Sequence, residues 1–135
     1  MRLKGSCHCG NVTFEFDDRP EWAIQCNCSV CRRLGARWIY STPDKIRLVY
    51  RQDATIRYAH GDRNIAFHTC RTCGCTTHWE NLVHPETGKL AVNLNMAEPA
   101  EENRIRVRHF DGADTWTFID ENPKSIGNKP ESNLP

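Results

Sequence analysis

The chain has 135 residues and nearly balanced charge, with 18 Lys and Arg against 17 Asp and Glu. This length suits a single domain, and the charge balance disfavours a nucleic-acid or membrane-surface protein, because both usually need a strongly basic face. No window approaches the roughly 18 apolar residues of a membrane-spanning helix, and the opening MRLKG lacks the apolar stretch of a signal peptide. We therefore expect a cytoplasmic protein with neither a nucleic-acid nor a membrane partner.

Short segments with alternating apolar and polar residues follow one another along the chain. Their β-branched and aromatic residues predict strands at 12–16, 38–40, 46–50, 55–58, 65–68, 90–95, 105–110 and 115–119. Turn-forming residues such as Asp111-Gly112 separate them. Short helical turns are predicted only after Ser29, ending at Gly35, and at 97–103. The pattern predicts an all-β domain of antiparallel strands, whose exposed edges would allow a homodimer.

The composition changes after Ile119, where DENPKSIGNKPESNLP has prolines and small polar residues but little to bury. We expect one folded domain at 1–120 and an extended or disordered tail at 121–135. Within the folded part, Arg104, Arg106 and Arg108 alternate in the sequence, which predicts the solvent-facing side of a strand.

Eight cysteines fall into three groups, Cys7 and Cys9, then Cys26, Cys28 and Cys31, then Cys70, Cys73 and Cys75. In a reducing compartment such groups indicate metal binding rather than disulfides. Zinc is the favoured ion because paired thiolates suit its tetrahedral geometry, and no ferredoxin-like cysteine run is present. Spacing does not decide which groups share an ion. Eight thiols could fill two sites, or fill one site and leave an open position at the other.

Three segments carry a resemblance to a known family: GSCHCGNVTFEF (5–16), CNCSVCRRLG (26–35) and FHTCRTCGCTTHW (67–79). In this order and at these separations they resemble the glutathione-dependent formaldehyde-activating enzymes, whose domain is shared by centromere protein V. The resemblance covers roughly residues 3–120. It implies an all-β fold of several small antiparallel sheets around zinc, known as a β-tent.

The resemblance also implies two zinc ions per chain. Cys7, Cys9, Cys70 and Cys73 would hold a structural zinc, and Cys26, Cys28 and Cys31 a second zinc at which family enzymes bind a thiol. Three thiolates leave one corner of a tetrahedral ion for a ligand from solution, which is typical of a catalytic ion. The implied activity is that of a carbon–sulfur lyase, which adds a small thiol, glutathione or another, to formaldehyde or a related aldehyde.

Cys75 leaves an alternative open, because it could be the fourth ligand of the second zinc. The site would then be structural, and the chain would be a non-catalytic zinc-scaffold interaction domain. Arg32 and Arg33 are expected beside the second zinc, where they could bind a substrate carboxylate. His78 is a candidate proton shuttle there. Three tryptophans are expected in the core or in a pocket wall, namely Trp38, Trp79 and Trp116.

Overall fold

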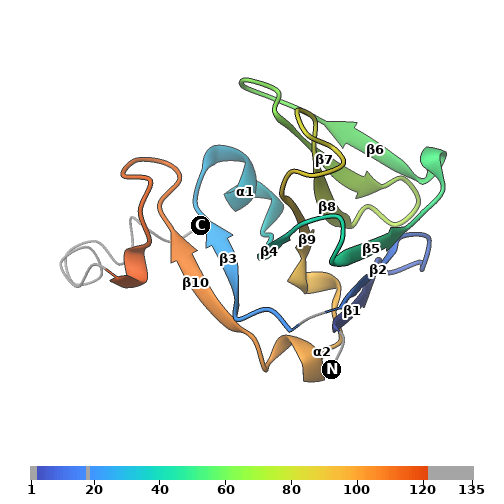
Figure 1. The fold of residues 1–135 in the computed structure, drawn as a ribbon, viewed down its shortest axis with the longest axis horizontal. Coiled ribbons are helices and arrows are strands. Elements are labelled where there is room, and N and C mark those ends of the chain that lie inside the picture. Colours follow the sequence, from blue (N-terminus) through green and yellow to red (C-terminus); the bar gives the residue numbers. More distant parts are fainter. Residues whose placement is uncertain (1–2, 18, 122–135) are drawn as a thin grey trace.

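The structure is a computed structural model that describes residues 3–17 and 19–121 (Figure 1). Almost all of the tail expected at 121–135 therefore lies outside the described residues. The strands are β1 (Leu3–Ser6), β2 (Thr13–Phe16), β3 (Trp22–Cys26), β4 (Trp38–Ser41), β5 (Ile46–Val49), β6 (Thr55–Tyr58), β7 (Ile65–Cys70), β8 (Thr76–Asn81), β9 (Leu90–Asn93) and β10 (Arg106–Phe110). The helices are α1 (Ser29–Leu34) and α2 (Pro99–Glu102), with 3-10 turns η1 (Gln52–Ala54), η2 (Leu94–Met96) and η3 (Ile119–Glu121). No helix in this part of the chain is long and apolar enough to cross a membrane.

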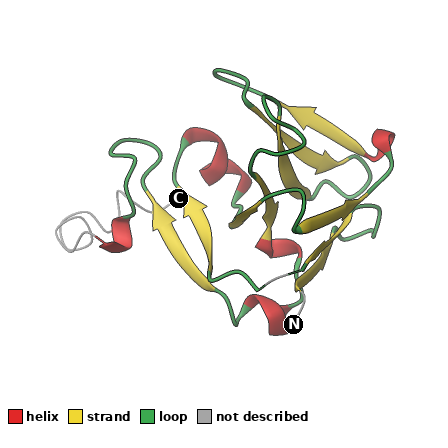
Figure 2. Cartoon of the chain, viewed as in Figure 1, coloured by secondary structure: helices red, strands yellow, loops and turns green. Residues whose placement is uncertain are grey.

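The strands form two sheets (Figures 1 and 2). A three-stranded antiparallel sheet has the order β1-β2-β5, and a seven-stranded sheet has the order β10-β3-β4-β9-β8-β7-β6. Every pair in the larger sheet is antiparallel except β10 and β3, which run parallel at one edge. The all-β prediction is confirmed, and the exclusively antiparallel arrangement is wrong at this one pair.

Side chains on the two faces of the seven-stranded sheet enter different clusters, because neighbouring residues of a strand point to opposite faces. On one face Ile39 and Val92 pack with Phe14 and Ile46 of the smaller sheet. On the other face Trp38, Phe67 and Ala91 pack with Cys26 and Cys31. The main hydrophobic core and the cysteines of β3 and α1 therefore lie on opposite sides of this sheet.

Three strands were not predicted from the sequence, namely β1, β3 and β8. β8, with the sequence TTHWEN, is too polar to show a clear apolar alternation, yet its two neighbouring strands, β7 and β9, hold Thr77 and His78 in the interior. The predicted strand at 115–119 is wrong, because only Phe118 pairs, through a single bridge to Phe110, and η3 follows at once.

Arg108 corrects another expectation. The alternation of Arg104, Arg106 and Arg108 predicted three exposed side chains, and the first two are exposed. Arg108 is buried, with its guanidinium 4.6 Å from the ring centre of Trp22 and 3.7 Å from that of Phe118. Such cation–π stacking compensates part of the cost of burying the charge.

Candidate metal centres

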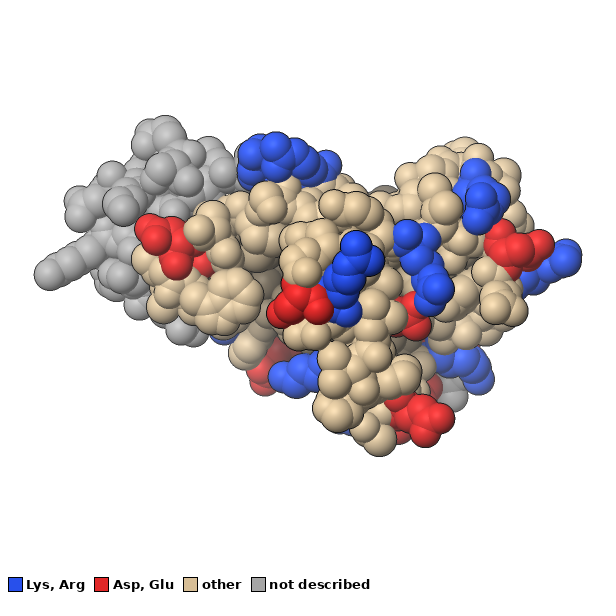
Figure 3. Space-filling view, turned by 90° about the horizontal axis from the view of Figure 1, so that it is seen from above, with Lys and Arg blue, Asp and Glu red and all other residues tan. Residues whose placement is uncertain are grey.

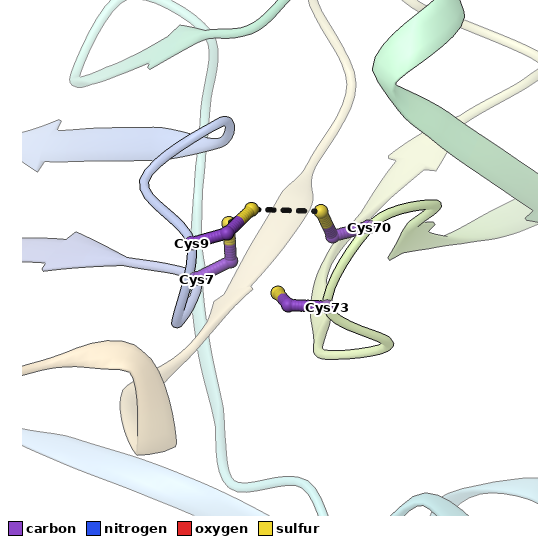
Figure 4. A group of neighbouring side chains, drawn as sticks. All are labelled: Cys7, Cys9, Cys70 and Cys73. Carbon is purple, nitrogen blue, oxygen red and sulfur yellow. Dashed lines mark hydrogen bonds between the residues drawn. The ribbon is translucent and has the colours of Figure 1, made fainter.

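The first candidate centre is the four-thiol group, Cys7, Cys9, Cys70 and Cys73, whose Sγ atoms all lie within 4.8 Å of one another. Figure 4 shows the four side chains pointing toward one another from two separate loops. Cys7 and Cys9 lie between β1 and β2, while Cys70 ends β7 and Cys73 follows it. The structure therefore brings together the four cysteines that the resemblance assigned to a structural ion.

Tight turns place each pair of sulfurs. Gly10 donates its N–H to the Cys7 carbonyl at 3.1 Å, and Gly74 donates to the Cys70 carbonyl at 2.9 Å. Both glycines have positive φ, +88° and +80°, a left-handed conformation that side chains other than glycine rarely tolerate. Each turn folds its chain back, so that two thiols can face a single point.

Electrostatics also suit a cation at the four-thiol group. The N–H of Val12 donates to the Cys7 Sγ at 3.3 Å. Against the effect of burial, the backbone N–H groups of Cys75 and Cys9 lower the pKa of Cys73 to about 5. The lowered pKa favours the thiolate of Cys73, whose charge a bound cation would neutralise. Four soft sulfur donors on two chain segments far apart in sequence are typical of a structural metal site.

The second candidate centre is the three-thiol group, Cys26, Cys28 and Cys31, whose Sγ atoms also lie within 4.8 Å of one another. Cys26 ends β3, and Cys28 is the N-cap residue of α1, where its sulfur accepts the N–H of Cys31 at 3.4 Å. The six-residue helix ends at Gly35, which has φ of +65° and donates to the Cys31 carbonyl at 3.0 Å. A single short helical turn therefore aligns the last two sulfurs with the first.

Further N–H groups point at these sulfurs. The N–H of Cys28 donates to the Cys26 Sγ at 3.5 Å, and the indole N–H of the fully buried Trp38 donates to the Cys31 Sγ at 3.4 Å. The hydrogen bond from Cys31, followed by backbone N–H groups of Cys28 and Gly112, lowers the pKa of Cys26 to about 6. Such donors stabilise negative sulfur and therefore favour a bound cation.

Residues 111–117, which we call the covering loop, close one side of the three-thiol group. Asn27 donates its side-chain N–H to Asp111 Oδ1 at 3.1 Å, and its own Oδ1 accepts the N–H of Ala113 at 3.0 Å. At Gly112 the approach is so close that a Cβ atom would lie 2.5 Å from the Cys26 Sγ. The sequence predicts only a turn at Asp111-Gly112, because nothing in it places Gly112 against a cysteine 86 positions earlier.

A cavity of about 580 Å³, which we call the aromatic cavity, opens beside Cys26. Six aromatic residues line it: Phe16, Trp22, Tyr40, Phe110, Trp116 and Phe118. They come from β2, β3, β4, β10 and the segment after β10. Burial, and then the neighbouring thiols of Cys31, Cys26 and Cys28, raise the pKa of Tyr40 above its ordinary value, so its phenol stays protonated at neutral pH.

Cys75 lies with the four-thiol group rather than with the three-thiol group. It packs in the cluster that contains Cys7, Cys70 and Cys73, and its carbonyl accepts the Cys70 N–H at 2.8 Å. Within the described residues, the group around Cys26 contains three cysteines and no fourth metal-binding side chain. The expectation that Cys75 could complete the second site disagrees with this placement, because the turn at Gly74 directs the chain back along β7.

The other candidates from the sequence are two arginines and three tryptophans. Arg32 and Arg33 are exposed on α1, and Arg33 donates to the Ser29 carbonyl at 2.7 Å and lines a separate hollow with Tyr58. Neither arginine lines the aromatic cavity. The tryptophans lie as expected: Trp38 belongs to the core, Trp79 packs against the same core cluster and edge-on against Tyr40 at 5.7 Å, and Trp116 lines the cavity wall.

His78 is buried on the opposite face of the sheet from the three-thiol group, where it pairs with Val92 and stacks on His68 at 4.2 Å. Its Nδ1 atom shares a hydrogen bond with Thr77 at 2.8 Å, and its Nε2 has no partner among the described residues. Burial, and secondarily His68, lowers the pKa of His78 to about 3. It therefore cannot shuttle protons at the Cys26 site.

Comparison with known proteins agrees with this geometry. The family model described as "Glutathione-dependent formaldehyde-activating enzyme" matches residues 2–110. A Halomonas elongata protein named "Putative glutathione-dependent formaldehyde-activating enzyme" is 28% identical over 127 residues, covering 81% of this chain and 77% of that protein. The crystal structure of a Rhodobacter sphaeroides protein, a structural genomics target, is similar with a TM-score of 0.61 and 31% identity. The match covers 78% of this chain and 99% of that one.

Proposed function

The chain belongs to the glutathione-dependent formaldehyde-activating enzyme family, and from this premise we propose that it is a zinc-dependent carbon–sulfur lyase. Its reaction would add a small thiol to formaldehyde or a related aldehyde, or reverse that addition. The observation that carries the proposal is the three-thiol group, which holds three sulfurs beside a cavity large enough for a small molecule.

The donor sets fit two zinc ions. All seven side chains are thiols, which suit zinc better than magnesium or calcium, and N–H groups donate to several of the sulfurs. The four-thiol group would hold a structural ion that ties β1 and β2 to β7. Cys26, Cys28 and Cys31 would hold the reactive ion, because only three protein sulfurs are present there. When bound, this zinc would lower the pKa of a substrate thiol in its open corner and so favour the nucleophilic thiolate.

The reaction balances without any further reagent. The substrate sulfur attacks the aldehyde carbon, a C–S bond forms, and the carbonyl π electrons move to the oxygen. The proton that the thiol lost returns to this oxygen, so the product is an S-hydroxyalkyl adduct. Tyr40 is suited to donate a hydrogen bond to the oxygen, because its protonated phenol lines the aromatic cavity together with Cys26.

The family's glutathione chemistry and the cysteine placement support this proposal over a non-catalytic zinc scaffold. A scaffold would be favoured if Cys75 completed the second site, and the packing of Cys75 in the cluster with Cys7, Cys70 and Cys73 supports the enzyme instead. On the face drawn in Figure 3, Lys and Arg are interspersed with Asp and Glu. This mixed pattern supports a small-molecule substrate rather than a nucleic acid. A cytoplasmic location, which would keep the thiols reduced, belongs to the same proposal.

The test is the exchange rate between [13C]formaldehyde and its thiol adduct, measured by two-dimensional exchange NMR with zinc-loaded protein. We expect the protein to accelerate exchange above the spontaneous rate, and Cys28→Ser to remove the acceleration. Cys75→Ser is the matched control, since it removes a thiol outside the three-thiol group. Equal rates with and without the protein, for glutathione and for apolar thiols, would refute the lyase. A rate that rises in Cys75→Ser would show that Cys75 does close the site.

A further inference from the structure

The aromatic cavity has few charged groups, although glutathione, the thiol named for the family, is itself highly charged. Of the described residues that line it, only Glu21 and Lys89 are charged, and the six aromatic side chains form most of the wall together with Ile24 and Pro20. Cys26 is the one lining residue that belongs to the three-thiol group. A ligand whose sulfur reaches this group would therefore lay the rest of its body against aromatic rings.

The wall is held in place by contacts within the chain. Trp116 is 70% exposed and has a positive φ of 59°, an unfavourable conformation for a large side chain. Its backbone N–H donates to the Asp111 carbonyl at 2.8 Å, and its ring contacts the Phe110 ring edge-on, with ring centres 5.1 Å apart. Arg108 stacks behind Trp22 and Phe118. An exposed tryptophan kept in a strained conformation at the mouth of a cavity indicates a binding role rather than a packing role.

Glutathione is a poor match for these groups. It carries two carboxylates, an ammonium and two peptide groups, and each would lose water on entering an apolar chamber. The cavity offers one carboxylate and one ammonium in return, from Glu21 and Lys89. The arginines expected to bind substrate carboxylates, Arg32 and Arg33, do not line it. An aromatic or branched alkyl group would bury its own apolar surface and that of the cavity wall, without removing water from any charged or peptide group.

We infer that the thiol taken at the three-thiol group carries an aromatic or branched alkyl body that fills the aromatic cavity, rather than a charged peptide. This inference rests on the proposed function for the position of the sulfur. It assigns specificity to Trp116, Trp22 and Phe118, which contact the body of the ligand and not its reacting atoms.

The test is a binding measurement that does not depend on turnover. A titration of the zinc-loaded full chain with 4-fluorobenzyl mercaptan is followed by fluorine NMR, and glutathione is then added as a competitor. We expect the mercaptan to bind at least about ten-fold more tightly than glutathione. Trp116→Ala should weaken its binding about ten-fold. Tyr58→Ala, which removes another largely exposed aromatic side chain from a different hollow, should leave binding unchanged.

The oxygen analogue 4-fluorobenzyl alcohol distinguishes binding through the aromatic body from binding through the sulfur. It should bind more weakly than the mercaptan, yet its affinity should still fall in Trp116→Ala. Glutathione displacing the mercaptan at equal or lower concentration would overturn the inference, as would unchanged binding in Trp116→Ala. Binding that disappears as the protein dimerises, with Trp116→Ala monomeric, would assign the cavity to a second copy of the chain and also overturn it. Binding as expected without faster formaldehyde exchange would refute the proposed lyase alone.

Discussion

Gly112→Ala tests whether the covering loop controls metal binding at the three-thiol group. Alanine adds only a methyl group, but that group would lie 2.5 Å from the Cys26 Sγ and 3.3 Å from the Cys28 Cβ. Contacts under 3.0 Å are essentially never observed for a Cβ atom, so either the loop or the sulfur must move. The loop has little freedom, because the Asn27–Asp111 and Ala113–Asn27 hydrogen bonds hold it against the β3 end.

Overpacking of this kind costs about 1–3 kcal/mol. If the displacement falls on the Cys26 sulfur, the cost appears as weaker metal binding, by about 5-fold to 150-fold. The four-thiol group lies on other segments of the chain and should be unaffected. We therefore expect Gly112→Ala to contain one tightly held zinc and one that a chromophoric chelator removes much faster than from the parent protein.

The assay is zinc content by mass spectrometry, followed by the time course of zinc transfer to the chelator. Ala113→Ser is the control, because it adds one atom to the next residue of the loop, where the side chain is exposed. Two zinc ions with parental release rates in Gly112→Ala would refute the reasoning. It would mean that the loop does not press on Cys26 in solution, or that the second ion is held elsewhere.

Three further predictions concern the rest of the molecule. Cys28→Ser should abolish formaldehyde exchange but keep the circular dichroism spectrum, whereas Cys73→Ser should unfold the domain; equal unfolding in both would contradict separate roles for the two groups. Gly5→Ala should lower the free energy of unfolding in urea by about 1–3 kcal/mol, because its Cβ would overlap the buried Phe14 ring; unchanged stability would disprove this packing. The pKa of His78 is about 3 in the folded chain against 6.5 in the unfolded chain. As the pH falls from 6.5 to 3 the unfolded state therefore gains a proton that the folded state does not, and the free energy of unfolding should fall by up to about 5 kcal/mol. His78→Gln should flatten that loss in urea titrations, and parallel slopes would exclude the mechanism.

Most of the grouping of the thiols could be predicted, because neighbouring residues largely determine it. Cys28 and Cys31 belong to one short helical turn that follows directly after Cys26 at the end of β3, and a capping cysteine with a glycine at the helix end aligns them. Cys70 and Cys73 likewise need only the turn at Gly74. The pairing of Cys7 and Cys9 with Cys70 and Cys73 was not local, and spacing left it open until the family resemblance implied it.

Other features depend on contacts between segments far apart in the sequence. Arg108 followed a solvent-facing pattern, but Trp22 on the neighbouring parallel strand and Phe118 beyond the turn enclose its guanidinium. His78 belongs to a polar segment that became an interior strand once β7 and β9 paired with it. In both cases tertiary packing overrode the local pattern, as it commonly does for β-strands.

The difference between local motifs and contacts of distant segments also applies to the proposed reaction and its substrate specificity. A run of three cysteines indicates a metal and, with a vacant corner, a place for a thiol. In the proposed reaction, the identity of that thiol depends on the wall beside Cys26, which is assembled from β2, β3, β4, β10 and the segment after β10. Because no single segment of the sequence contains this wall, a matching cysteine motif can carry over the reaction of a family without carrying over its substrate. Trp116, which sits outside every family-like segment of the sequence, is the residue on which that distinction depends.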